Sequence, residues 1–395
     1  MTKKNKLNRR NFLEISGLGA MGLMLATNSF SQTNKSTKKM LLYIGTYTNS
    51  GKSQGIYVHQ FDSATGKLTP LQSIKDVLDP SFLAIKGDKK YLYAVNELVE
   101  YEGMKSGAVS AFSIDQTTGN LQLLNKQPSF GDAPCHITVS ANQKFVLVAN
   151  YLGGNVAVYP IQDDGKLGEK VDLVQHSGTG PNKDRQEAAH AHSITLSPDN
   201  RFAYACDLGI DKIMIYRFDD TTGKLTTNEN QAFFETKAGA GPRHFTFHPN
   251  GKFAFVVNEL DWTITSFAFD KDLGTLKEIQ TVPTLPSGAS TVGVTCADIH
   301  VSPNGKFLYA SNRGHNSIVS YKIDEQSGKL EYIEHTSTQG KTPRNFAIEP
   351  NGKFLLVANQ NSDNVVVFRI DEKTGKLKAT KNIAKVPVPV CLKFM

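Results

Sequence analysis

A short turn motif recurs seven times along the chain, and this repetition constrains the fold more than any other feature of the sequence. The motif is typically Thr-Gly-Lys-Leu, as at Thr65–Leu68 and Thr374–Leu377. Its glycines are Gly66, Gly119, Gly165, Gly223, Gly274, Gly328 and Gly375, spaced 46 to 58 residues apart. This spacing is close to the length of one four-stranded blade with its loops. The repeat therefore predicts an all-β fold, a seven-bladed β-propeller.

A second turn motif alternates with the first. His248–Phe253, Ser302–Phe307 and Glu349–Phe354 each contain Pro-Asn-Gly followed by Lys-Phe. Weaker copies stand at Asp88, Asn142 and Asp199. Pro-Asn-Gly between two apolar runs indicates a hairpin, because Asn and Gly tolerate positive φ. Each repeat is therefore predicted to run as strand a, Pro-Asn-Gly turn, strand b, loop, strand c, Gly-Lys-Leu turn and strand d.

The two ends of the repeat region complement each other. Pro387–Phe394 resembles a lone strand a, and Leu41–Gly45 resembles a strand b that lacks its partner. We expect the C-terminal strand a to join the N-terminal strands b to d and to complete the seventh blade. Such closure removes open sheet edges. The propeller is therefore expected to span residues 40–395.

The N-terminus has the features of a twin-arginine export signal. Asn8–Leu13 reads Asn-Arg-Arg-Asn-Phe-Leu, and a modestly apolar stretch runs from Ile15 to Ala26. A basic start followed by such a stretch is typical of a signal peptide. Ser29 and Ser31 supply small residues for cleavage after Ser31. The alternative, an uncleaved anchor, is less favoured because the apolar stretch is short for a bilayer.

Much of the net positive charge of the chain lies in residues 1–31, which the predicted cleavage would remove. This segment holds five Lys or Arg and one Glu of a chain whose formal charge is +7, so +3 remains. The other lysines are scattered over turns, which does not indicate a nucleic-acid surface. We expect a signal peptide over 1–31, a flexible linker over 32–39, and a mature periplasmic monomer with no membrane span and no nucleic-acid partner.

The four cysteines lie far apart and form no zinc-binding pattern. They fall in strand-like runs, where we expect them to pack as small apolar residues. An oxidising compartment would also permit disulfides. The cysteines are Cys135, Cys206, Cys296 and Cys391.

Strand direction places both regular turns on one side of the ring and the d–a and b–c loops on the other. On that second side the repeats stop resembling each other. The first position of strand a holds Ser81, Cys135, His192, Arg243, Ala297, Arg344 and Val390. The next position holds Phe82, His136, Ser193, His244, Asp298, Asn345 and Cys391. The end of strand b holds Glu97, Tyr151, Leu208, Glu259, Arg313 and Gln360. Folding alone gives little reason for charged residues to vary in this way from repeat to repeat. The variation therefore predicts a functional site on this second side of the ring, which we call the mouth of the propeller.

The longest interruption of the repeat is the loop Ser177–Ala191, which leads into His192. Its polar residues include Lys183, Arg185, Gln186, Glu187 and His190. Loops held by a rigid scaffold often carry sites. His190 and His192 could form a metal-binding pair, but the arginine-rich surroundings disfavour a cation, so no metal or cofactor is expected. The Asn that recurs before the b–c loop suits a local cap better than a ligand.

Several of these segments together resemble the seven-bladed lactonase family. They are Asn182–Glu187, His190–Ser193, Gly241–His244 and Val257–Leu260. The family includes 6-phosphogluconolactonase-like proteins and the carboxymuconate-lactonising enzyme. The resemblance covers the whole mature chain and implies a lactonase of the same fold.

The resemblance implies that His192, Arg243 and Glu259 are the catalytic positions. Ester hydrolysis needs a base for water, a cation for the oxyanion and an anchor for substrate charge. We therefore expect Glu259 or His192 to be the general base and Arg243 to stabilise the oxyanion. The expected substrate-binding residues are Arg185, Arg313 and Arg344 as anion anchors, with His136, His190, His244, Glu97 and Asn258.

Three functions follow as hypotheses. The first is a 6-phosphogluconolactonase-like lactone hydrolase for a small anionic lactone or sugar acid. The second is a muconate-type cycloisomerase in the same mouth. The third is a non-catalytic propeller that binds a polyanion or a protein, which predicts an exposed apolar patch at the mouth. The arginines and histidines there favour the first, and the export signal favours an extracytoplasmic lactone over the cytosolic pentose-phosphate intermediate.

Overall fold

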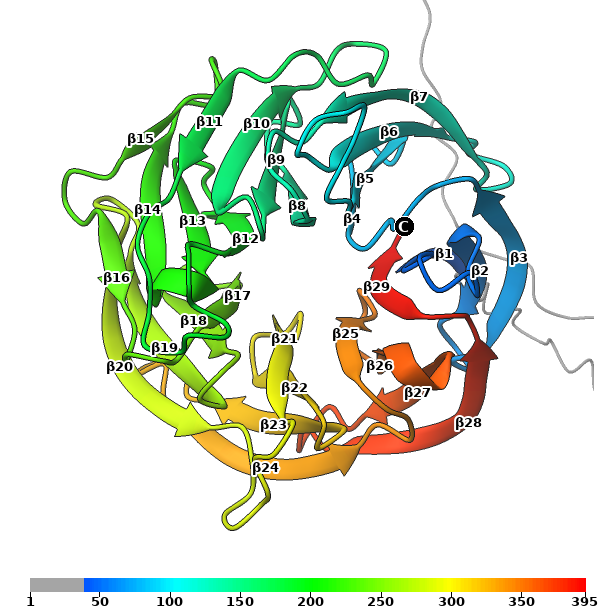
Figure 1. Ribbon diagram of the computed structural model, residues 1–395. Coiled ribbons are helices and arrows are strands. Elements are labelled where there is room, and N and C mark those ends of the chain that lie inside the picture. Colours follow the sequence, from blue (N-terminus) through cyan, green and yellow to red (C-terminus); the bar gives the residue numbers. More distant parts are fainter. Residues whose placement is uncertain (1–38) are drawn as a thin grey trace, which may run out of the picture. The chain divides into compact units, whose positions relative to one another are not determined.

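The structure, a computed structural model, describes residues 39–395, which form a closed ring of seven sheets (Figure 1). This confirms the predicted all-β, seven-bladed propeller. The predicted signal peptide and residues 32–38 of the predicted linker lie outside the described residues, whereas Lys39 already begins the first strand. No helix within 39–395 has the length and apolar character needed to span a membrane.

The innermost strand of each sheet faces the centre of the ring in Figure 1, and the second strand packs behind it. The innermost strands are β4 (Leu83–Ile85), β8 (Pro134–Val139), β12 (Ala191–Leu196), β17 (Pro242–Phe247), β21 (Thr295–Val301), β25 (Pro343–Ile348) and β29 (Pro389–Phe394). The second strands are β5 (Tyr91–Asn96), β9 (Phe145–Asn150), β13 (Phe202–Asp207), β18 (Phe253–Asn258), β22 (Phe307–Arg313), β26 (Phe354–Asn359) and β1 (Lys39–Thr46).

The two outer positions complete each sheet. The third strands are β6 (Ala108–Ile114), β10 (Asn155–Pro160), β14 (Lys212–Phe218), β19 (Thr263–Asp270), β23 (Ser317–Ile323), β27 (Asn364–Ile370) and β2 (Gly55–Asp62). The outer strands are β7 (Leu121–Pro128), β11 (Asp172–Gln175), β15 (Leu225–Thr227) with β16 (Phe233–Glu235), β20 (Thr275–Pro283), β24 (Leu330–Ser337), β28 (Leu377–Lys385) and β3 (Leu68–Lys75). The split into β15 and β16 departs from the four strands expected per blade. Two short 3-10 helices, η1 (Leu208–Ile210) and η2 (Gln360–Ser362), follow β13 and β26.

The seventh blade combines both ends of the described chain, as predicted. Its sheet has the order β29-β1-β2-β3. β29 pairs antiparallel with β1 and places Leu392 opposite Ile44. Both side chains are buried, so the contact joins the C-terminal strand to the core as well as to the sheet. In Figure 1 the red β29 lies beside the blue β1 at the inner edge of the ring.

The Gly-Lys-Leu motif recurs because its glycine has two roles. All seven glycines have φ between 69° and 84°, which favours glycine. A Cβ at Gly274 would also overlap the ring of Phe202 in the preceding blade. The Tyr204 hydroxyl donates a hydrogen bond of 2.9 Å to the Gly274 carbonyl. The same bond joins Tyr43 to Gly119, Tyr93 to Gly165 and Tyr309 to Gly375. The repeated turn therefore locks each blade to its neighbour.

All four cysteines are buried and free. Cys206 and Cys296 have no exposed surface, in agreement with the expectation that the cysteines pack as small apolar residues.

Candidate active site

The second residue of several innermost strands forms a β-bulge, and this bulge directs its side chain. In β17, Pro242 pairs with Asn258 and His244 pairs with Val257, so Arg243 is the extra residue. The same shift occurs at Cys135, His192, Arg344 and Val390. Bulges locally re-aim a side chain and are common beside active sites. The positions that the repeat alignment equates therefore converge on one mouth of the ring.

A small pocket lies where these residues meet. It is lined by Ser81, Phe82, Cys135, Arg243, His244, Arg344 and Val390. Five of them are strand a first positions, and Phe82 and His244 are the following positions in their blades. This pocket and the loops around it form the mouth.

Glu259 is the centre of a buried arginine cluster beside this pocket. Its Oε2 lies 2.8 Å from Arg243 Nε and 2.9 Å from Arg313 Nη2, and its Oε1 accepts a 2.6 Å hydrogen bond from Arg185 Nη2. Burial would raise the pKa of Glu259, but Arg313, Arg243 and Arg185 outweigh burial and lower this pKa to about 2. Glu259 is therefore an anion that orders three guanidinium groups. Surrounded in this way, it is poorly suited to accept a proton.

Arg243 is nearly fully buried, at 1% exposure. Burial and the neighbouring Arg313 and Arg344 lower its pKa to about 10, so it stays charged at neutral pH. Its Nη1 also donates to the Ala297 carbonyl. These contacts on two edges of the guanidinium fix the orientation of the group.

Arg185 reaches Glu259 from the loop that precedes β12. The Gln186 amide anchors this loop by donating to the Leu208 carbonyl and to Asp211 Oδ1, each at 2.8 Å. Arg185 Nη2 also donates to the Tyr151 hydroxyl at 3.2 Å. Its side chain is 36% exposed, so Arg185 is the most exposed arginine of the cluster.

A second acidic residue of the mouth, Glu97, contacts Tyr47 and Arg344. Glu97 Oε2 accepts a 2.9 Å hydrogen bond from the Tyr47 hydroxyl, and Glu97 Oε1 lies 4.0 Å from Arg344 Nη2. The Arg344 guanidinium stacks over the Tyr47 ring at 5.3 Å. Burial raises the pKa of Glu97 despite the opposing charge of Arg344. The two mouth glutamates thus differ in their readiness to take a proton.

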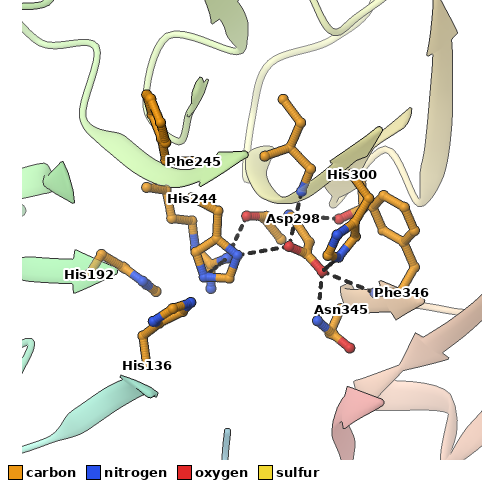
Figure 2. Close-up of polar contacts among 12 residues, drawn as sticks. His136, His192, His244, Phe245, Asp298, His300, Asn345 and Phe346 are labelled. Atoms are coloured by element: carbon orange, nitrogen blue, oxygen red, sulfur yellow. Dashed lines mark hydrogen bonds and ion pairs between the residues drawn. The ribbon is translucent and has the colours of Figure 1, made fainter. Parts of the chain in front are cut away.

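Three imidazoles face one another at the mouth (Figure 2). The ring centroid of His244 lies 5.5 Å from that of His136 and 5.4 Å from that of His192. Burial lowers the pKa of all three, and Arg243 adds to the effect at His192. All three rings are therefore neutral at neutral pH.

Two expected binding residues make contacts of their own. The ring nitrogens of His190 contact the Tyr151 carbonyl at 3.0 Å and Glu187 Oε1 at 3.1 Å, so His190 holds the loop. The Asn258 amide donates to the Thr263 hydroxyl at 2.8 Å, whereas its buried Oδ1 has no hydrogen-bond partner among the described residues. Asn258 therefore bonds to a side chain and does not form the backbone cap that was expected of the recurrent Asn. Within residues 39–395 no group of three or more His, Cys, Asp or Glu is arranged to hold a metal.

Tyr47 belongs to the mouth and was missed by the sequence interpretation. It follows Thr46 at the end of β1, the position that Glu97 and Glu259 occupy in their blades. The repeat alignment compared only the six complete blades at this position. Extending it to the strand formed by Leu41–Gly45 would have identified Tyr47.

Comparison with known proteins identifies relatives over nearly the whole length. The family described as lactonase, seven-bladed β-propeller, matches residues 41–394. A 6-phosphogluconolactonase from Bacillus subtilis (strain 168) is 37% identical over 357 residues, covering 90% of this chain and 99% of the relative. The structure of the periplasmic gluconolactonase PpgL from Pseudomonas aeruginosa is 34% identical with a TM-score of 0.83, covering 90% of this chain and 99% of that one.

A 6-phosphogluconolactonase from Formosa agariphila is also 37% identical, over 75% of this chain and 83% of the relative. The family match over residues 41–394 covers every blade, including the seventh, and it agrees with the fold. The chain therefore belongs to the seven-bladed β-propeller lactonase family.

Proposed function

We propose that this protein is a lactonase that hydrolyses a small anionic lactone, of the sugar-acid class, at the mouth of the propeller. The observation that carries the proposal is the arginine cluster around Glu259. Arg185, Arg243 and Arg313 share this one carboxylate. The cluster keeps an excess of positive charge that an anionic substrate would balance.

The roles of the charged residues follow from their contacts. Arg243 is buried and held rigidly, which suits it to stabilise the oxyanion that forms when water attacks the lactone carbonyl. Arg313 is held by the Cys296 carbonyl at 2.9 Å, while its buried Nε–H has no acceptor among the described residues. Arg313 and Arg344 are therefore proposed as anchors for the substrate anion, and Glu259 as the residue that orders the guanidinium groups.

The substrate class is supported by the relatives as well as by the charge. One relative is named 6-phosphogluconolactonase and a structural neighbour is named gluconolactonase. Both names denote lactones of sugar acids. A phosphate or a carboxylate on the sugar would contact the arginine guanidinium groups, which can bind such anions through two parallel hydrogen bonds.

Acid release measured in a pH-stat tests the proposal. The wild type should open δ-lactones of sugar acids well above the spontaneous rate, with a lower KM for those that carry a phosphate or carboxylate. Arg243→Ala should lose most of this rate, and Arg313→Ala should raise KM. Wild-type hydrolysis no faster than buffer would contradict the proposal. A change in the ultraviolet spectrum of cis,cis-muconate would instead support the cycloisomerase.

We also propose that the protein is exported through the twin-arginine pathway and acts in the periplasm as a monomer. The support is the Asn8–Leu13 motif and the similarity to PpgL, which is named a periplasmic protein. Cell fractionation of the full chain and of a variant with Arg9→Lys and Arg10→Lys tests export. The variant should remain in the cytoplasm, and equal periplasmic amounts of both would contradict the proposal.

A further inference from the structure

His244 makes a hydrogen bond that neither of its neighbouring imidazoles makes. Its Nδ1 lies 2.8 Å from Oδ1 of Asp298 on β21, and both side chains are buried. Figure 2 shows Asp298 on the side of His244 that faces away from His136 and His192. An ionised carboxylate only accepts hydrogen bonds, so the His244 proton resides on Nδ1 and the lone pair on Nε2.

The Asp298 carboxylate is firmly held as an anion. Its Oδ2 accepts hydrogen bonds from Asn345 Nδ2 at 2.6 Å, His300 Nε2 at 2.9 Å and the Phe346 backbone N–H at 3.3 Å. Its Oδ1 also accepts from the Ile299 backbone N–H at 3.0 Å. So many donors stabilise the charged form. Asp298 therefore offers His244 a fixed acceptor that neighbouring blades position.

The other two imidazoles lack such a partner. His136 Nδ1 accepts a 3.4 Å contact from the Ile194 backbone N–H, and His192 Nδ1 lies 3.6 Å from the Cys135 sulfur. Within residues 39–395 no carboxylate forms a hydrogen bond with either ring. On the free side of His244, Nε2 has one contact, 3.3 Å to Arg243 Nη1. This contact is long for a hydrogen bond, so His244 Nε2 is less firmly engaged than Nδ1.

We propose that His244 Nε2 is the general base of lactone hydrolysis and that Asp298 is its positioning residue. The inference rests on the proposed function and assigns the base to neither His192 nor Glu259. His244 takes a proton from water as the water oxygen bonds to the lactone carbonyl carbon, whose π electrons move to the oxygen beside Arg243. When the ring C–O bond breaks, His244 returns the proton to the leaving oxygen, and the product is the open hydroxy acid.

Two features of the mouth favour this assignment. Glu259 already contacts three guanidinium groups, whereas His244 lines the pocket together with Arg243, the proposed oxyanion residue. Burial and then Arg243 lower the pKa of His244 to about 4, so the ring is neutral at neutral pH but a weak base, and Asp298, which opposes the shift, stabilises the imidazolium as it forms. The arrangement of base and carboxylate resembles the pairing of histidine and aspartate in serine hydrolases, with water as the nucleophile.

Two variants test the proposal in the intact protein. His244→Asn can keep a donor to Asp298 but removes Nε2. Asp298→Asn keeps the volume but presents an amide N–H to His244 Nδ1, which moves the imidazole proton to Nε2. Each should lower kcat by about 10²- to 10⁴-fold, the usual contribution of a general base, with KM changed less than threefold. The matched control is His248→Asn at the other end of β17, where Nε2 contacts the Gly305 carbonyl, and it should keep kcat within about twofold.

Imidazole ¹⁵N NMR of the wild type and of Asp298→Asn gives a readout that does not depend on turnover. The His244 signals, assigned by their loss in His244→Asn, should report a protonated Nδ1 in the wild type and a protonated Nε2 in Asp298→Asn. An active wild type whose two variants retain kcat within threefold would overturn the base assignment alone. A wild-type proton on Nε2 would overturn it as well. A wild type without hydrolysis would overturn the proposed function and the inference together.

Discussion

Arg243 Nε lies 2.8 Å from Glu259 Oε2, and both residues are at most 2% exposed. The pair joins the second residue of β17 to the residue that follows β18, so it spans the inner two strands of one blade. Arg313 and Arg185 reach the same carboxylate from the next blade and from the loop before β12. One buried anion therefore links several segments around the mouth.

Glu259→Gln should destabilise the propeller by about 3–5 kcal/mol, because it leaves buried guanidinium groups without their counter-charge. The free energy of unfolding in urea at pH 7 measures the effect. Glu331→Gln is the matched control, since Glu331 is 78% exposed and lies 3.9 Å from Lys322. The control should change stability by less than about 0.5 kcal/mol. Equal stabilities of the two variants would show that the buried cluster contributes little.

The contribution of Glu259 should depend on pH. Its pKa falls from an ordinary 4.5 to about 2 in the folded protein. A carboxyl with a lowered folded pKa stabilises the fold above its unfolded pKa, and this contribution is lost as the pH falls through the folded pKa. About 3 kcal/mol of stability should therefore disappear between pH 5 and pH 2 in the wild type. Urea unfolding of wild type and Glu259→Gln across this range measures it, and a constant difference between them would contradict it.

Arg243→Lys should lower kcat/KM by about 10²-fold or more while keeping the positive charge. Lysine lacks the planar fork that contacts Glu259 and the Ala297 carbonyl together, so the oxyanion donor loses its fixed position. Steady-state hydrolysis rates measure the loss. Arg217→Lys on the exposed outer part of β14, where Arg217 pairs with Glu229 at 3.2 Å, should leave the rates unchanged. Equal losses in both variants would point to a general effect of the substitution.

Gly274→Ala should cost more stability than Gly251→Ala, although both glycines have similar positive φ values of 69° and 67°. A Cβ at Gly274 meets the Phe202 ring, whereas a Cβ at Gly251 meets nothing within 4 Å. The backbone strain is shared, at about 1 kcal/mol, and the overlap should add about 1–3 kcal/mol at Gly274. Thermal unfolding of the two variants measures the difference. Matching melting temperatures would refute the packing role of the repeated glycine.

The number of blades and the closure of the ring could be predicted from the sequence because the glycine of each turn is needed at every blade interface. The closure of the ring was predicted from the two complementary strands, Leu41–Gly45 and Pro387–Phe394. The split of one outer strand into β15 and β16 could not be predicted, because the turn Thr222–Leu225 that leads into β15 has the same pattern as the turns of the unsplit blades.

The structure brings several of the predicted mouth positions together, and the contacts among them were less predictable. His190 is close to His192 in sequence, yet the bulge after Ala191 separates their roles. Asp298 was aligned with the mouth positions but was not assigned a function, because its bond to His244 joins neighbouring blades. A contact between residues more than fifty positions apart leaves no local pattern.

The pairing of β29 with β1 has a consequence for the order of synthesis. Among the described strands β1 is synthesised first and β29 last. The inner edge of β1 therefore has no partner until β29 has been made, so the ring cannot close on a nascent chain that still lacks β29. A variant truncated before Pro389 would leave the inner edge of β1 open to other strands.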